Sequence, residues 1–256
     1  MIDTHSHLYL EEFDEDRSEV VERAKLSGVK HLILPNVDLE TVPSLLATKK
    51  QFPDYCSVAM GLHPTSVGND YQKDLQEIER LFLDENPVAI GEVGIDLYWD
   101  KTFVKEQIVA FEQQLQWAAD LHLPIIIHNR EATNEILSSL RKFVGKVTGV
   151  FHCFSGNETE AKTMLDFGFK LGINGIVTFK KSTLPQVLSK LNINDLLIET
   201  DMPYLSPTPY RGKRNESAYM LQTALKLSEI FEVDLSEIKR VTTKNAITLF
   251  QLTEVS

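Results

Sequence analysis

Short runs of apolar and β-branched residues recur along the chain, and segments with helical spacing separate them. Each run has the length and composition of a buried strand. Eight such strands are predicted, at residues 2–7, 31–37, 56–64, 88–96, 124–130, 149–156, 169–178 and 196–203. One intervening segment carries an apolar stripe with steps of four, three, four and three residues, which predicts a helix. The stripe consists of Val104, Ile108, Phe111, Leu115 and Ala118.

Capping residues mark several of the predicted helix ends. Asn157 and Glu160 have the spacing of a capping box, and Gly28 suits the C-terminal end of the first helix. The acidic run at residues 14–16 lies where that first helix should begin, and there it interacts favourably with the helix dipole. We therefore interpret the acidic run as structural.

Eight strands that alternate with helices are typical of a (β/α)₈ TIM-type barrel, so we predict one barrel domain over residues 1–256. The alternative is a doubly wound open sheet, which usually has a glycine-rich phosphate-binding turn after the first strand. Here that turn reads His-Ser-His-Leu at residues 5–8 and contains no glycine, which disfavours the alternative. In a barrel, the chemistry is expected at the carboxyl ends of the strands.

Composition excludes several classes of protein. Apolar residues make up 43% of the 256 residues and charged residues 25%, which is typical of a globular chain and not of a disordered or fibrous one. No apolar run is long enough to span a membrane, and no leader pattern is visible at residues 1–5, so we expect a cytoplasmic protein. We also expect it to be a monomer. Cys56 and Cys153 are predicted to be buried free thiols.

The net charge of −11 limits how the protein could bind nucleic acid. Sequence-independent binding to a polyanion depends on many Lys and Arg contacts with phosphates. An acidic protein that handles nucleic acid therefore needs a local basic patch or bound metal cations.

Histidines and carboxylates gather at the predicted strand ends. A single histidine or aspartate at such a place is more often structural, but the group as a whole would be costly to bury without cations. Imidazole and carboxylate ligands in this number suit one or two divalent metals. His31 and His122 are excluded, because one opens a strand at the opposite end and the other ends a helix. The group consists of His5, His7, His63, Glu92, His128, His152 and Asp201.

The motifs around these residues resemble the TatD-type metal-dependent hydrolases, a family within the amidohydrolase-like barrels, and the resemblance covers nearly the whole chain. One position departs from the family pattern, because Ser217 stands where a proline is usual, which leaves the rigidity of that turn open. The matching motifs are DTHSHL at 3–8, GLHP at 61–64, GEVGID at 91–96, HNR at 128–130, FHCFSG at 151–156, ETDMP at 199–203 and RGKRN at 211–215.

The resemblance implies two divalent metal ions. Magnesium is the ion usual in family nucleases, whereas the imidazole-rich ligand set favours zinc, manganese or nickel. Many relatives in the wider superfamily bridge the metals with a carbamylated lysine, and a glutamate in that place resembles the phosphodiester-cleaving branch. By this analogy the first metal is held by His5, His7 and Asp201, the second by His128 and His152, and Glu92 bridges them.

Such a site would hydrolyse a phosphodiester with water that the two metals activate. Asp201 would orient or deprotonate that water, Glu92 would hold both metals, and His63 would contact a phosphate oxygen or the leaving group. Flanking phosphates would meet basic residues, although an ordinary solvated loop is an equally good interpretation of the last three of them: Arg130, Arg211, Lys213 and Arg214.

The resemblance also implies a deoxyribonuclease that acts on single-stranded or frayed 3′ ends in the manner of a 3′–5′ exonuclease. Base stacking could involve aromatic residues after the fourth and eighth strands, although packing within the loops is at least as good an interpretation. These residues are Tyr98, Trp99, Tyr204 and Tyr210.

Two other functions stay open at this point. The first is a hydrolase of the same barrel superfamily that acts on a C–N bond or a carboxylic ester, such as an aminoacyl-tRNA ester. The second is a binding module without catalytic activity, but a binding module has no need of six metal ligands, which disfavours it.

Overall fold

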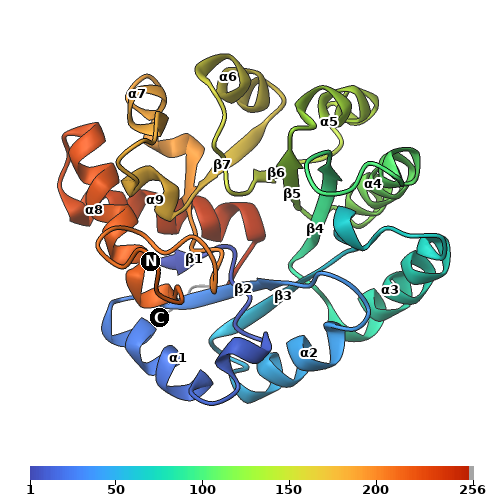
Figure 1. Cartoon of the computed structure of the whole chain (residues 1–256), viewed down its shortest axis with the longest axis horizontal. Coiled ribbons are helices and arrows are strands. Elements are labelled where there is room, and N and C mark those ends of the chain that lie inside the picture. Colours follow the sequence, from blue (N-terminus) through green and yellow to red (C-terminus); the bar gives the residue numbers. More distant parts are fainter. Residues whose placement is uncertain (254–256) are drawn as a thin grey trace.

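The computed structural model describes residues 1–253. Eight parallel strands form a single sheet in the order in which they occur along the chain, and the sheet curves into a barrel surrounded by helices (Figure 1). This confirms the predicted (β/α)₈ barrel. The strands are β1 Ile2–Asp3, β2 His31–Pro35, β3 Cys56–Met60, β4 Ala89–Asp96, β5 Ile125–Arg130, β6 Gly149–Phe151, β7 Phe169–Ile173 and β8 Leu196–Ile198.

Each strand is followed by a helix on the outside of the barrel, and α9 follows as an additional helix. The helices are α1 Arg17–Leu26, α2 Val42–Gln51, α3 Tyr71–Glu85, α4 Val104–Leu121, α5 Thr133–Leu140, α6 Glu158–Asp166, α7 Leu184–Leu188, α8 Met220–Phe231 and α9 Leu235–Phe250. Short 3₁₀ helices lie between them at Glu11–Phe13, Pro64–Ser66, Arg141–Phe143, Gly175–Thr178, Ile193–Asp195 and Ser217–Tyr219.

Several strands are shorter than the apolar runs predicted. β1, β6 and β8 end at Asp3, Phe151 and Ile198, although the runs continue for four or more residues. Cys153 and Asp201 have φ angles of 49° and 58°, and this left-handed backbone cannot continue a strand ladder. The ends of these runs therefore turn into the mouth of the barrel.

Backbone hydrogen bonds close the barrel between its first and last strands. The N–H of Thr4 donates to the carbonyl oxygen of Ile198 over 3.3 Å. The N–H of Asp201 donates to the carbonyl oxygen of His5 over 2.9 Å. The N–H of His7 donates to the carbonyl oxygen of Met202 over 3.0 Å. These bonds lock the segments after β1 and β8 together, so residues 5, 7 and 201 are held side by side.

The N-terminal end of the barrel interior is apolar. Small and branched side chains of the strands meet there, and α9 packs its last turn against them. This cluster consists of Ile2, Ile33, Ala59, Ala89, Ile126, Val150, Leu197, Ala246 and Phe250. We call this cluster the plug, because it fills the N-terminal end of the barrel. A binding site is therefore expected at the opposite end, at the carboxyl ends of the strands.

The local predictions are confirmed at the helix ends. The side chain of Asn157 accepts the N–H of Glu160, whose carboxylate accepts the N–H of Asn157, and Gly28 ends α1 with a φ of 83°. Cys56 is a buried free thiol as predicted, but Cys153 is also free and is only partly buried, because it lines the central cavity. Within residues 1–253, no helix has the length and apolar character required to cross a membrane.

Candidate metal centre

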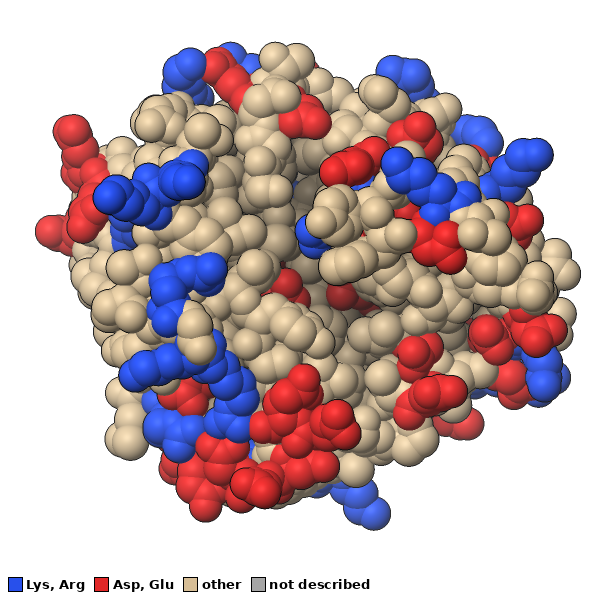
Figure 2. Space-filling view, in the orientation of Figure 1, with Lys and Arg blue, Asp and Glu red and all other residues tan. Residues whose placement is uncertain are grey.

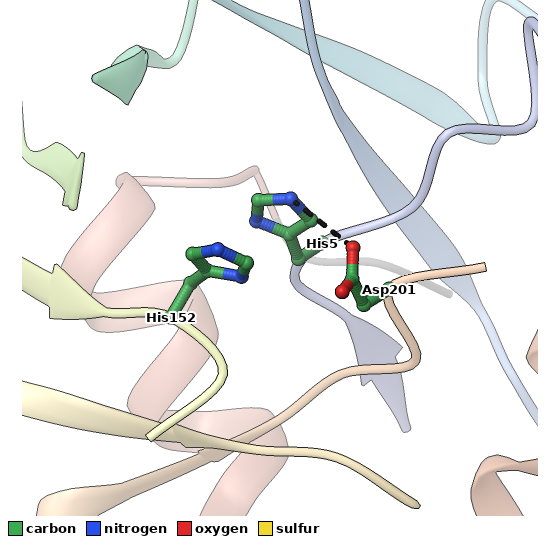
Figure 3. Close-up of side chains that lie close together, drawn as sticks. All are labelled: His5, His152 and Asp201. Atoms are coloured by element: carbon green, nitrogen blue, oxygen red, sulfur yellow. Dashed lines mark ion pairs between the residues drawn. The ribbon is translucent and has the colours of Figure 1, made fainter. Parts of the chain in front are cut away.

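The side chains predicted as metal ligands converge at the carboxyl ends of five strands. His5 and His7 follow β1, Glu92 lies in β4 and His128 in β5. His152 and Asp201 follow β6 and β8. Most of these side chains line a cavity of about 740 Å³ at the mouth of the barrel. In Figure 3 the rings of His5 and His152 lie face to face, with centroids 3.9 Å apart, and the carboxylate of Asp201 points to His5.

One group of donor atoms surrounds the Oε2 atom of Glu92. The Nε2 atoms of His5 and His7 lie 3.0 and 3.7 Å from it, and 3.2 Å from each other. The Oδ1 atom of Asp201 lies 3.8 Å from His5 Nε2 and 3.5 Å from His7 Nε2. Two imidazole nitrogens and two carboxylate oxygens therefore face a common point.

A second group of donor atoms surrounds the other oxygen of the same carboxylate. Glu92 Oε1 lies 2.8 Å from His152 Nε2 and 2.9 Å from His128 Nδ1. His63 Nε2 is 3.4 Å from the same oxygen and 3.2 Å from His128 Nδ1. His63, which was predicted as a substrate contact, thus lies within the donor group itself.

The two groups fit divalent cations because of their chemistry and their spacing. In each group, three donor atoms from His5, His7 and Glu92, or from His63, Glu92 and His128, lie within 4.8 Å of one another. A third set of this kind consists of His5, His152 and Asp201. Imidazole and carboxylate donors are the ligands of zinc, manganese and related ions. Glu92 joins the groups by presenting a different oxygen to each.

The electrostatics of the site keep both carboxylates ionised. Burial opposes the charged form of Glu92, but the surrounding imidazoles, with His152 and His5 foremost, outweigh it and hold the pKa of Glu92 well below its usual value. Burial also opposes the charged form of Asp201, and the hydrogen bond with His7 lowers its pKa overall. A metal ligand must be deprotonated, so these shifts favour metal binding.

The imidazoles are shifted in opposite directions. Burial, together with the neighbouring His152, lowers the pKa of His5 and favours its neutral form, which is the form that binds a metal. Burial would lower the pKa of His152 as well, but Glu92 and Glu199 raise it well above its usual value.

Sequence reasoning missed the residues that support the ligands. Asp96 Oδ2 lies 2.9 Å from His128 Nε2, and Tyr9 OH lies 2.9 Å from His7 Nδ1. The alternation of side chains along β4 could have revealed Asp96, because it stands four residues after Glu92 and so on the same face. Such partners fix the orientation of a ligating imidazole and typically matter nearly as much as the ligand.

Asp96 also holds the loop between β4 and α4. Its Oδ1 atom accepts the N–H groups of Tyr98 and Trp99 over 2.9 and 3.0 Å. Burial opposes the charged form of Asp96, but the bond to His128 and these two N–H groups lower its pKa to about 2. The burial of His128 is likewise outweighed by Asp96 and Glu92, which raise its pKa.

The four basic residues predicted to bind phosphates lie in different surroundings. Arg130 lines the cavity, whereas Arg211, Lys213 and Arg214 are not among the described residues that line it. The guanidinium of Arg211 lies over Phe179, 3.8 Å from the ring centroid. Lys213 lies 5.9 Å from the ring centroid of Tyr210, so each of these two cations lies near an aromatic ring.

Arg214 is engaged in an ion pair and does not line the cavity. Its NH1 and NH2 nitrogens lie 2.8 and 2.7 Å from the two carboxylate oxygens of Asp16, which also pairs with Arg23. The acidic run before α1 is therefore structural, as predicted, but chiefly because Asp16 anchors the loop after β8.

Figure 2 shows Lys and Arg side chains on the side of this face where α7 and α8 lie, and acidic side chains in the central hollow.

The remaining residues singled out in the sequence have clear structural places. His31 is buried in β2, with its Nε2 atom 2.8 Å from Ser57 Oγ, and His122 ends α4, so both lie outside the site as predicted. Tyr210 stacks on Tyr219 with centroids 3.8 Å apart, while Tyr204 lines the cavity.

Ser217, the departure from the family pattern, donates a hydrogen bond of 2.6 Å to the buried carboxylate of Asp3. Asp3 also accepts the hydroxyl of Thr200 over 2.6 Å. A side-chain hydrogen bond thus ties this turn to β1.

Comparisons with known proteins agree with this geometry. A family model described as "TatD related DNase" matches residues 2–251. An uncharacterized metal-dependent hydrolase of Bacillus subtilis, YabD, is 39% identical over 254 residues, which cover 98% of this chain and 99% of the relative. The 3′-5′ ssDNA/RNA exonuclease TatD of Pectobacterium parmentieri is 31% identical over 98% of this chain and all of its own.

A solved structure shows the same architecture. The crystal structure of YJJV, a TatD homologue from Escherichia coli K12, superposes with a TM-score of 0.92 at 28% identity and covers 99% of this chain and 98% of that one. The family match, the relatives and the ligand geometry agree. The chain therefore belongs to the TatD family and is a metal-dependent hydrolase.

Proposed function

We propose that this protein hydrolyses phosphodiester bonds of single-stranded DNA from the 3′ end. The observation that carries the proposal is the division of the Glu92 carboxylate, with Oε2 toward His5 and His7 and Oε1 toward His128 and His152. A carboxylate that joins two ligand groups is suited to a pair of cations, and paired cations are typical of enzymes that cleave phosphodiesters. Relatives that are named 3′-5′ ssDNA/RNA exonucleases support the same activity.

Two divalent ions, when bound, would supply a Lewis acid and an activated water for in-line displacement at phosphorus. One would be held by His5, His7 and Asp201 and the other by His128 and His152, with Glu92 between them. Asp201 is ionised and faces the first group, so its carboxylate can accept a hydrogen bond from the attacking water and orient it. Asp96 and Tyr9 hold the imidazoles of His128 and His7 in place.

His63 is suited to donate a hydrogen bond to the substrate. The N–H of Thr65 donates to His63 Nδ1 over 3.2 Å, and the Thr65 hydroxyl lies 2.6 Å from the same nitrogen. Because Nδ1 accepts, the proton of the neutral ring resides on Nε2, which faces Glu92 Oε1 and His128 Nδ1. Burial lowers the pKa of His63 and so favours this neutral form. A nitrogen that carries a proton cannot ligate a cation, so we assign His63 to a phosphate oxygen or to the leaving group and not to a metal, although it lies within the second donor group.

The distribution of charge favours a short single-stranded substrate. The protein has a net charge of −11, and Arg130 is the member of the four predicted phosphate contacts that lines the cavity. A tight duplex-binding surface would need many more phosphate contacts than this. An enzyme that binds the end of one strand needs few.

The test is hydrolysis of a 5′-labelled single-stranded oligonucleotide by the purified protein, with magnesium, manganese, zinc and nickel supplied in turn. We expect a ladder of products shortened from the 3′ end, which EDTA abolishes and which His128→Ala abolishes as well. His122→Asn serves as the matched control, because His122 lies outside the site and asparagine tolerates its left-handed backbone. Turnover of a carboxylic ester or an amide with an inert oligonucleotide would contradict the proposal and support the alternative hydrolase activity.

A further inference from the structure

Two large aromatic side chains are exposed on the loop between β4 and α4. Trp99 is 69% exposed and Tyr98 is 49% exposed, whereas Trp117, the other tryptophan of the chain, is buried at 6%. Their rings meet edge to face with centroids 4.9 Å apart. Exposed aromatic surface of this size next to a polar cavity is typical of a binding surface.

Trp99 stands between two hollows. It lines the cavity of about 740 Å³ that contains the ligand groups, and it also lines an adjoining hollow of about 370 Å³. Thr65 is shared by both as well, while Pro64, Val67 and Phe103 give the second hollow apolar walls. Its volume falls in the range of about 300–1,000 Å³ that is usual for small-molecule sites.

Arg130 adds a positive charge beside the two aromatic rings. Its guanidinium lies 4.2 Å from the ring centroid of Tyr98 and 5.6 Å from that of Trp99. Within residues 1–253, no carboxylate forms an ion pair with Arg130, in contrast to Arg214, which pairs with Asp16. Because Arg130 lies over the face of Tyr98, Trp99 is the ring available for stacking, and an exposed indole with a cation nearby matches a nucleobase that is followed by a phosphate.

Asp96 connects this surface to the candidate metal centre. One of its carboxylate oxygens accepts the backbone N–H groups of Tyr98 and Trp99, and the other contacts His128 Nε2. The backbone that carries the two rings is therefore held at a fixed place relative to a ligand of the reacting centre. A substrate group bound on Trp99 would keep its neighbouring linkage in register with Glu92.

We propose that Trp99, with Tyr98 and Arg130, is a nucleobase subsite. One base of a single-stranded polynucleotide stacks on Trp99 in the 370 Å³ hollow, and Arg130 binds the adjoining phosphate. The next linkage then lies over the ligand groups around Glu92. This inference deepens the proposed nuclease function and rests on it for the identity of the substrate.

The fluorescence of Trp99 reports directly on the inference. Stacking of a base quenches an exposed tryptophan, while the buried Trp117 stays as an internal reference. The probe is a single-stranded phosphorothioate oligothymidylate, and the control is an oligomer of equal length and charge that carries abasic residues. We expect quenching by the first and not by the second. Trp99→Phe should remove the quenched component and leave the emission of Trp117.

Kinetics on ordinary DNA provide the second measurement. Trp99→Ala should raise KM for single-stranded DNA about 5- to 150-fold, which corresponds to the loss of one stacked base, with kcat changed much less. Trp99→Phe should restore most of the affinity, since a smaller ring still stacks. On the abasic oligomer, Trp99→Ala and the unaltered protein should have the same KM. Leu26→Ala, at an exposed position on α1, is the matched control for loss of surface apolar area.

The outcomes separate this inference from the proposed function. A KM increase of equal size on the abasic oligomer would show that Trp99 acts on the structure of the loop and would overturn the subsite. DNA hydrolysis that is insensitive to Trp99 would overturn the subsite and leave the nuclease function. Quenching that depends on the bases, without any DNA hydrolysis, would support the subsite and contradict the nuclease function.

Discussion

The two ends of the barrel are built from the same strands but bury side chains of opposite character. At the N-terminal end, side chains such as Ile33, Ile126 and Phe250 pack into an apolar cluster. At the C-terminal end, imidazoles and carboxylates are buried almost as deeply, with His5 at 0% and Glu92 at 3% exposed. Burial of apolar groups stabilises the fold, whereas burial of polar groups costs free energy unless each has a partner.

The comparison shows where stability and function reside. β4 passes from Ala89 in the apolar cluster to Glu92 in the ligand groups within three residues. The donor atoms contact one another, as His152 Nε2 contacts Glu92 Oε1. A cation would replace these contacts with stronger ones. The polar end is therefore maintained for binding, and the apolar end and its plug supply the stability that supports it.

The largest effect is expected at the plug. Phe250→Ala removes a ring that is 2% exposed from the end of α9 and leaves a cavity beneath the barrel. Loss of a buried Phe costs about 3–5 kcal/mol of unfolding free energy. Urea unfolding should show this decrease, while the activity per folded molecule stays unchanged. Leu225→Ala, at an exposed position on α8, should change stability by no more than about 0.5 kcal/mol.

An activity loss equal to the stability loss would contradict the separation of the two ends. It would mean that packing in the plug also determines the positions of the ligand groups around Glu92.

Glu92→Gln should produce the largest effect at the opposite end. Glutamine keeps the size of the side chain but removes the charge that both donor groups share. We expect activity to fall about 100-fold or more, above the 10- to 100-fold cost of losing a residue that only supports a ligand. Metal content measured by elemental analysis should fall as well. Ile126→Val, at the apolar end of the neighbouring strand, should cost about 0.5–1.5 kcal/mol of stability without loss of activity.

Asp96→Asn tests the support behind a ligand. Asparagine keeps an oxygen for the N–H groups of Tyr98 and Trp99 but removes the negative charge beside His128. Metal affinity or activity should fall about 10- to 100-fold. The fluorescence of Trp99 should stay unchanged, because the loop keeps its hydrogen bonds. Asp120→Asn, at an exposed position on α4, is the control, and a loss of equal size there would refute the assigned role of Asp96.

Much of the fold and of the ligand set could be predicted from the sequence. The alternation of strands and helices gives the barrel, and the barrel brings His5, His128 and Asp201 to one end although the chain separates them. The same-face spacing of Glu92 and Asp96 along β4 also indicates a role for Asp96. What a pattern cannot supply is pairing across long stretches of chain: the packing of Phe250 beneath Ile126, and the ion pair of Arg214 with an acidic residue near α1, depend on the closed barrel.

That ion pair gives the smallest expected effect and decides whether the rim beyond the cavity belongs to the site. The hydrogen bond from Arg214 holds the pKa of Asp16 below its usual value; burial opposes this shift and the hydrogen bond from Arg23 adds to it. A lowered pKa in the folded state gives stability that is present at neutral pH and is lost as the pH falls through that pKa.

Arg214→Ala should therefore lower the unfolding free energy at pH 7 by no more than about 1 kcal/mol, since the pair is partly exposed. Urea unfolding at a series of pH values should show the difference from the unaltered protein shrinking as the pH falls below about 4, the usual pKa of an aspartate. KM for single-stranded DNA should not change, because the guanidinium is committed to Asp16 and not to a phosphate. A clear rise in KM, larger than that caused by Arg211→Ala, would instead place Arg214 on the path of the substrate and extend the functional end of the barrel to its outer rim.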